Sequence, residues 1–186
     1  MNAKLDLTET QINSPRLLLR PWQDADAADL FEVASADVAE EMIGRPRHKT
    51  LADSQRAIEA YREKKNCFAI EHKADKKVIG YMELHGSWAG GDPRFAHLTV
   101  CELGTFISKT YWGGGIAAEA GFAAVDFCFN TLGLDAVTVC HFVTNSQSGR
   151  VIEKMGFEFM QESNFHSRSL NRDFMEKQYI KHRSLS

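Results

Sequence analysis

The chain has 186 residues, of which 44% are hydrophobic, and this length and composition fit one domain with a sizeable core. We therefore predict a single domain over residues 1–186, with its core between about residues 14 and 180. The net charge of −3, without a basic stripe interleaved with aromatic residues, argues against nucleic-acid binding. No apolar run approaches the roughly 18 residues that cross a membrane, and the N-terminus lacks the apolar core of a signal peptide, so we expect a soluble cytoplasmic protein.

The first third of the chain alternates between predicted strand and predicted helix. Residues 1–13 are polar enough for a loose leader, and residues 14–22 form an apolar run bounded by prolines, which predicts a strand. An apolar helical stripe with acidic residues at its start predicts a helix over residues 24–34. Residues 37–49 are predicted to be irregular, and residues 50–64 show a helical apolar face with Thr50 or Asp53 as a cap.

Strands dominate the middle of the chain. Residues 67–71 and 78–85 read as a hairpin, and residues 97–108 as a central strand, because apolar residues occupy both of its faces. Glu102 is the exception in that strand, since a buried carboxylate is costly unless it is hydrogen-bonded or takes a proton. Gly104 permits a bulge, and a bulge would splay this strand from its neighbour.

Three consecutive glycines at residues 113–115 precede a strongly helix-forming segment that reaches about residue 132. The first N–H groups of a helix are unpaired, and a loop without side chains lets an anion approach them closely, so we expect a phosphate or pyrophosphate ligand. No lysine follows the glycines as in a nucleotide P-loop, and the match to a dinucleotide fingerprint, with Ala118 at the third glycine position, is weak. A plain strand-to-helix turn is the remaining alternative.

The last third returns to strands. Residues 134–143 form a predicted strand that follows the long helix, and such a strand–helix–strand crossover implies parallel pairing. A short helix is predicted over residues 146–155, a strand over residues 157–160 and a last strand over residues 173–180. Residues 181–186 are predicted to be a polar, frayed tail.

Cysteine and histidine spacing gives no sign of a metal site. The cysteines are far apart and mostly lie in apolar runs, so we expect reduced thiols in the core. No His-Glu-x-x-His motif is present, and we predict no metal. The cysteines are Cys67, Cys101, Cys128 and Cys140.

Residues 112–117, Trp-Gly-Gly-Gly-Ile-Ala, resemble the acetyl-coenzyme A pyrophosphate loop of the GNAT N-acetyltransferase superfamily. Trp112 stands in a slot that this superfamily's pattern gives to Arg or Gln, and this form resembles the branch of the ribosomal-protein N-terminal (alanine/serine) acetyltransferases. Two distant segments are similar to the same family: residues 14–21, Ser-Pro-Arg-Leu-Leu-Leu-Arg-Pro, and residues 145–157, which resemble its second signature.

The resemblance implies an α/β fold of mixed type, with a central twisted mixed sheet of about six to seven strands flanked by helices. It implies acetyl-coenzyme A (acetyl-CoA) in the splay between the strands at residues 98–108 and 135–142, and an acceptor pocket lined by residues 37–65. The residues expected to contact the cofactor are Thr105, Phe106, Ile107, Trp112, Gly113, Gly114, Gly115, Ile116, Ala117, Ala118, Asn145, Ser148 and Arg150.

Amine acetylation requires a base, because a primary alkylammonium with a pKa near about 10.4 is unreactive while protonated. Glu102 is the first candidate, since a partly desolvated carboxylate has a raised pKa, and Glu83 on a neighbouring strand is the second. Backbone N–H groups near residues 105–107 are candidate donors to the thioester oxygen. Many GNAT enzymes protonate the leaving thiolate with a tyrosine; this chain has Ile152 in that slot, and Ser148 is the candidate substitute.

The resemblance therefore implies transfer of an acetyl group from acetyl-CoA to a primary amine by direct attack on the thioester. The acceptor is a protein N-terminal amine or a small-molecule amine, and the chain is a monomer or a homodimer. A GNAT-like protein that binds acyl-CoA without catalysis is the alternative.

Overall fold

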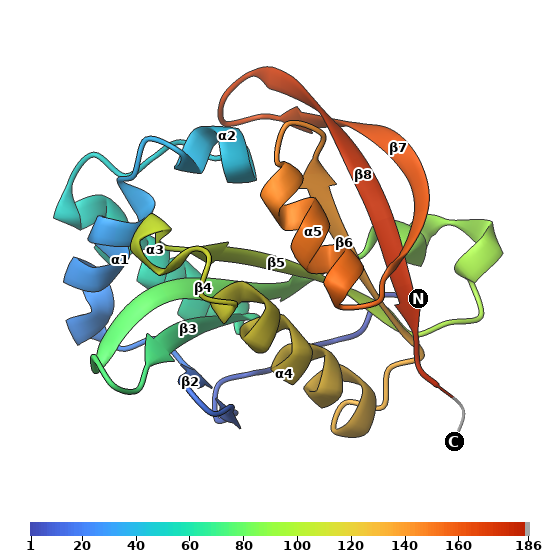
Figure 1. Cartoon of the computed structure of the whole chain (residues 1–186), viewed down its shortest axis with the longest axis horizontal. Coiled ribbons are helices and arrows are strands. Elements are labelled where there is room, and N and C mark those ends of the chain that lie inside the picture. Colours follow the sequence, from blue (N-terminus) through green and yellow to red (C-terminus); the bar gives the residue numbers. More distant parts are fainter. Residues whose placement is uncertain (185–186) are drawn as a thin grey trace.

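The computed structural model describes residues 1–184, which form one mixed sheet with helices on both faces. The strand order across the sheet is β1-β2-β3-β4-β5-β6-β8-β7 (Figure 1). The predicted mixed α/β class is confirmed, with eight strands in place of six to seven; the strand that sequence patterns missed, β1, has only two residues. The strands are β1 (Ile12–Asn13), β2 (Leu17–Arg20), β3 (Cys67–His72), β4 (Lys77–His85), β5 (Val100–Ile107), β6 (Ala136–Phe142), β7 (Glu158–Ser167) and β8 (Arg172–His182).

The helices divide the core between the two faces of the sheet. The α4 and α5 helices bury Ile116, Ile152 and neighbouring apolar residues against one face, whereas α1 and α3 bury Leu30, Ile58 and others against the opposite face. Burial of these apolar stripes stabilises the fold at roughly 25 cal/mol per Å² of apolar surface removed from water. The helices are α1 (Ala27–Ala34), α2 (Ala39–Ile43), α3 (Leu51–Lys64), α4 (Ile116–Asn130) and α5 (Ser146–Lys154).

The parallel pairing of β5 with β6 stops halfway along both strands. Its last pair is Leu103 with Val139, although each strand continues for several residues. The predicted splay is therefore present, but the bulge that Gly104 permits is not, because the register between β4 and β5 runs across Gly104 without a shift. The β6 strand instead pairs with β8 up to Phe142, and it follows β8 away from β5.

Three segments that the sequence predicts to be irregular are ordered. Residue Ala3 donates from its backbone N–H to the Val100 carbonyl, and Leu7 is 2% exposed, so the leader packs beside β5. Residues 39–43 form α2, which ends at Gly44 in the left-handed conformation (φ 64°). Residues 181 and 182 belong to β8, and of the predicted frayed tail residues 185–186 lie outside the described residues.

A buried ion pair fixes the connection from β2 to α1. The Nη1 and Nη2 atoms of Arg20 donate to the two carboxylate oxygens of Asp26 at 2.8 Å each, and Arg20 Nε donates to Glu71 on β3 at 2.8 Å. Bidentate pairs of this kind are strong and geometrically specific. Arg20 and Asp26 thus hold the start of α1 against the sheet.

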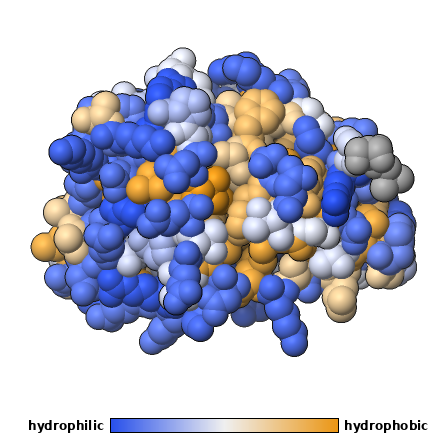
Figure 2. All heavy atoms as spheres, turned by 90° about the horizontal axis from the view of Figure 1, so that it is seen from below, coloured by the Kyte–Doolittle hydropathy of each residue, from blue (hydrophilic) through white to orange (hydrophobic). Residues whose placement is uncertain are grey.

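The surface carries mostly polar side chains. Seen from below, hydrophilic residues surround hydrophobic ones that gather near the middle of the face (Figure 2). On α4 the side chain of Phe122 is 45% exposed. Within residues 1–184, no helix is both long and apolar enough to cross a membrane.

Candidate active site

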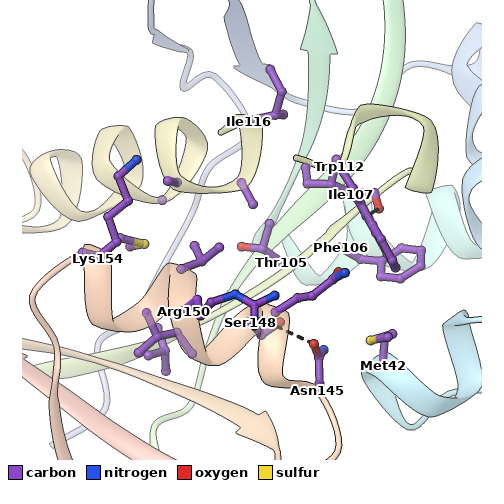
Figure 3. Close-up of a pocket in the computed structure, with 18 of the residues that line it drawn as sticks. Met42, Thr105, Phe106, Ile107, Trp112, Ile116, Asn145, Ser148, Arg150 and Lys154 are labelled. Atoms are coloured by element: carbon purple, nitrogen blue, oxygen red, sulfur yellow. Dashed lines mark hydrogen bonds between the residues drawn. The ribbon is translucent and has the colours of Figure 1, made fainter. Parts of the chain in front are cut away.

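A cavity of about 410 Å³ opens where β5 and β6 separate. The end of β5 forms one wall, the glycine loop with the start of α4 a second, and α5 a third (Figure 3). The α2 helix contributes Met42 and Ile43. Strand ends beside a helix N-terminus are the usual place for ligands in α/β proteins.

The glycine loop adopts backbone conformations that other residues rarely take. Gly113 has φ 80°, and Gly115, the N-cap of α4, has φ 76°. A Cβ atom at Gly113 would meet nothing within 4 Å, and one at Gly115 would meet only Arg16 Nη2 at 3.8 Å. The loop therefore leaves its backbone N–H groups open to an approaching group at the positive end of the α4 dipole.

Two aromatic residues anchor the front of this loop. The indole Nε1 of Trp112 donates to the Ile107 carbonyl at 2.8 Å, and the Tyr111 hydroxyl donates to Asp75 at 2.6 Å. This hydrogen bond to Asp75 raises the pKa of Tyr111 to about 12. Trp112 thus ties the loop to the last residue of β5.

The opening motif of the chain anchors the back of the loop. Glu119 in the first turn of α4 accepts hydrogen bonds from Ser14 Oγ at 2.6 Å and from Arg16 Nε at 2.7 Å. Arg16 Nη1 also donates to the Gly114 carbonyl at 2.8 Å. Two of the motifs that resemble the family, residues 14–21 and residues 112–117, therefore contact each other in the fold.

The α5 helix supplies the positive side chains of the cavity. Asn145 caps it by accepting from the Ser148 N–H at 3.1 Å, and both residues line the cavity. Arg150 and Lys154 of α5 line the cavity, and Lys154 extends toward α4 (Figure 3). Among the described residues that line the cavity these two alone are charged, and both are cationic. The lining therefore suits an anion.

Glu102 lies beside the cavity and does not line it. Its side chain is 14% exposed; Oε2 accepts from Thr138 Oγ1 at 3.0 Å, and Oε1 lies 4.0 Å from His85 Nε2. Burial raises the pKa of Glu102 above its ordinary value, and Glu176 adds to the rise, although His85 and Thr138 oppose it. Cys140 does line the cavity, and burial and the nearby Glu102 carboxylate raise the pKa of its thiol.

Glu83 has a different environment. It is 6% exposed, and its carboxylate forms an ion pair with Arg45 Nη2 at 2.7 Å. Arg45 follows α2, so this pair holds the segment after α2 against the sheet. Glu83 is absent from the residues that line the cavity.

Hydroxyl groups near the cavity are candidates for the role that the family resemblance gives to a tyrosine, which is to protonate the leaving thiolate. Ile152 is 6% exposed and lines the cavity with an apolar side chain. The Tyr111 hydroxyl is already bonded to Asp75, whereas the Ser148 hydroxyl has no hydrogen-bond partner among residues 1–184. Within the same residues, no group of three or more His, Cys, Asp or Glu side chains is placed to hold a metal ion.

The structure brings nearly all the predicted cofactor residues to one cavity. Gly114 alone does not line it; it borders a second hollow together with Arg16 and Glu119. Lys154 was missed, although its spacing of four residues from Arg150 on a predicted helix places both on one face. The other lining residues missed from sequence include Met42, Ile43, Tyr111, Val139, Cys140 and Gln147.

Comparisons with known proteins identify this architecture. A GNAT-family acetyltransferase from Bacillus anthracis superposes with a TM-score of 0.79 at 19% identity, covering 93% of this chain and 98% of that one. The spermidine N-acetyltransferase from Vibrio cholerae, solved in complex with CoA and spermine, gives a TM-score of 0.71 at 17% identity, covering 91% and 96%. A proposed ribosomal-protein-serine acetyltransferase from Vibrio cholerae gives 0.74 at 17% identity, covering 95% and 99%.

Sequence comparison reaches the same family. The uncharacterized N-acetyltransferase YoaA of Bacillus subtilis is 28% identical over 152 residues, which is 79% of this chain and 82% of the relative. The acetyltransferase (GNAT) domain family matches residues 16–158. This chain therefore belongs to the GNAT acetyltransferase family, as its motifs predicted.

Proposed function

We propose that this chain is an acetyl-CoA-dependent N-acetyltransferase that acetylates a primary amine by direct attack on the thioester. The observation that carries the proposal is the cavity at the β5–β6 splay, where a glycine loop, a helix N-terminus and two cationic side chains converge. Family membership and the names of the relatives support the same reaction.

The cavity fits the parts of acetyl-CoA. The amides of the glycine loop suit the pyrophosphate, and Arg150 and Lys154 offset its negative charge. Beyond Leu103 the β5 edge has no partner on β6, so backbone N–H groups near residues 105–107 are candidate donors to the thioester oxygen. Bound acetyl-CoA supplies the activated acetyl group, and the residues around it orient that group and exclude water.

Glu102 is our proposed general base. It is partly desolvated, its pKa is raised, and it lies one residue before the cavity-lining Leu103. Because Glu102 does not itself line the cavity, we place a water molecule between it and the amine. Proton transfer from the ammonium to Glu102 leaves a neutral amine that can attack the thioester carbonyl.

Ser148 is our proposed proton donor to the leaving thiolate. Its hydroxyl lines the cavity and lacks a partner among residues 1–184, while Ile152 occupies the position of the usual tyrosine. Ser148→Ala should therefore lower the rate of thiol release while Asn145 still caps α5 through the backbone N–H of residue 148. An unchanged rate would exclude Ser148 as the donor.

The acceptor belongs to one of two classes, a protein N-terminal amine or a small-molecule amine. One structural neighbour is described as acting on ribosomal-protein serine and another on spermidine, and the N-terminal motifs favour the first branch. Met42 and Ile43 on α2 bring the predicted acceptor-side segment to the cavity. This segment is where we expect acceptor choice to be set.

Two measurements test the proposal. Acetyl-CoA at a hundredfold excess over its Kd should stabilise the fold by about 2.7 kcal/mol, which raises the Tm of a chain of this size by roughly 5–10 °C. Release of free CoA thiol should then occur with at least one member of a panel of amines and N-terminal peptides. A raised Tm without thiol release would indicate a protein that binds acyl-CoA without catalysis. A Tm that acetyl-CoA does not change would show that the chain does not bind this cofactor.

The base is tested with a matched pair of variants. Glu102→Gln should lower turnover by about 10²–10⁴-fold and recover rate at alkaline pH, where the acceptor deprotonates without help. The wild-type enzyme should lose activity as acid protonates Glu102. Glu83→Gln removes a carboxylate of the same sheet that is already paired with Arg45, so it should affect turnover much less. If Glu83→Gln lowered turnover more than Glu102→Gln does, Glu83 would be the base instead.

A further inference from the structure

A carboxylate occupies the first turn of α4, beside the proposed pyrophosphate site. Glu119 is 15% exposed in its side chain and borders the hollow that Gly114 and Gly115 also line. Acidic residues stabilise helix N-termini, yet here the proposed ligand of that N-terminus is also an anion. An uncompensated Glu119 would repel it.

Arg16 lies between this carboxylate and the glycine loop. Its Nε donates to Glu119 Oε2 at 2.7 Å and its backbone N–H to Glu119 Oε1 at 2.8 Å. Its Nη1 donates to the Gly114 carbonyl at 2.8 Å. Burial disfavours ionisation of Glu119, but hydrogen bonds from Ser14 and Arg16 outweigh it and lower the pKa of Glu119. The carboxylate is therefore ionised at neutral pH and needs the adjacent cation.

The bond to Gly114 also sets the direction of a neighbouring donor. In a trans peptide the C=O of one residue and the N–H of the next point in opposite directions. Holding the Gly114 carbonyl toward Arg16 therefore turns the Gly115 N–H the other way, and Gly115 lines the main cavity. Arg16 thus acts on the loop from the side away from the ligand.

We propose that Arg16 is a positioning residue for the cofactor: it neutralises Glu119 and orients the Gly114–Gly115 peptide so that its N–H faces the pyrophosphate. This inference rests on the proposed function. It differs from a direct phosphate contact, because the guanidinium is engaged by Glu119 and by a backbone carbonyl.

Titration calorimetry with CoA on the full chain separates these roles. Arg16→Gln should raise the Kd for CoA about tenfold. The increase should be larger at low salt than at high salt, because salt screens the repulsion between Glu119 and the pyrophosphate. Glu119→Gln should leave the Kd unchanged or lower it severalfold, since it removes the repelling charge and keeps Arg16. The double variant should bind more tightly than Arg16→Gln. Arg16→Lys should lie between wild type and Arg16→Gln, because it keeps a charge without the forked geometry.

The outcomes are distinct. An Arg16→Gln protein with wild-type Kd would overturn the inference, and so would a double variant as weak as Arg16→Gln, because neutralisation of Glu119 would then contribute nothing to binding. If Arg16→Gln fails to fold, Glu119→Gln still decides, because the inference expects an unchanged or lower Kd for it: a raised Kd in that variant overturns the inference. Wild-type protein that does not bind CoA would overturn the proposed function, whereas wild-type binding with unaffected variants overturns only the role of Arg16.

Discussion

Replacement of Gly115 by alanine tests whether backbone geometry shapes the glycine loop. Gly115 has φ 76°, and a non-glycine residue in that region costs about 1–2 kcal/mol. The new methyl group would meet nothing nearer than Arg16 Nη2 at 3.8 Å, so steric contact adds no further cost. Gly114 is the matched control, because it does not have a positive φ and its added Cβ would meet only the Tyr111 carbonyl at 3.9 Å.

Both variants lose the same backbone freedom in the unfolded chain, so their difference isolates the strain at Gly115. We expect Gly115→Ala to melt about 2–8 °C below Gly114→Ala, from about 1–2 kcal/mol and about 2–4 °C per kcal/mol for a chain of this size. Thermal unfolding monitored by circular dichroism measures this difference. Equal melting temperatures would show that the left-handed conformation is not required and would refute the reasoning.

Three further changes test other parts of the structure. Burial raises the folded-state pKa of Glu102, so ionisation of Glu102 destabilises the fold as pH rises through that pKa. Glu102→Gln should therefore raise the Tm near about pH 8 and leave it unchanged well below the ordinary value of 4.5. A change in Tm that is the same at every pH would contradict this. Asp26→Ala leaves Arg20 buried without its bidentate partner and should cost about 3–5 kcal/mol in urea unfolding; a cost under about 1 kcal/mol would show that the pair is dispensable. Trp112→Phe removes the indole bond to β5 and should cost about 0.5–1.5 kcal/mol in unfolding experiments while weakening CoA binding in calorimetry, so unchanged stability and affinity would exclude the anchoring role.

Features set by neighbouring residues were predictable from the sequence. Thr50 caps α3 with Asp53 as its partner three residues on, and the glycine triplet falls where α4 begins, because capping and turn chemistry act within a few residues. The parallel crossover from β5 to β6 also followed from the order of strand, helix and strand.

Features set by distant residues were not predictable. The splay depends on β6 pairing with β8 and not on a bulge at Gly104, and no local pattern near Gly104 reports that pairing. The ion pair of Glu83 with Arg45 and the contact of Arg16 with Glu119 likewise join segments far apart in the chain. The packed leader was missed because its contacts come from β5, whereas its own composition is that of a loop.

The order of the last strands affects how the protein can be made. The final strand, β8, begins at Arg172 and lies between β6 and β7, so both neighbours are synthesised before the strand that joins them. Until then β6 has an open edge, and open edges recruit strands of other chains. Beyond Val139, β6 is held by β8 alone, and Cys140 in that stretch lines the cavity. A chain that ends before β8 is therefore expected to aggregate and not to persist as a shorter protein with a working cavity.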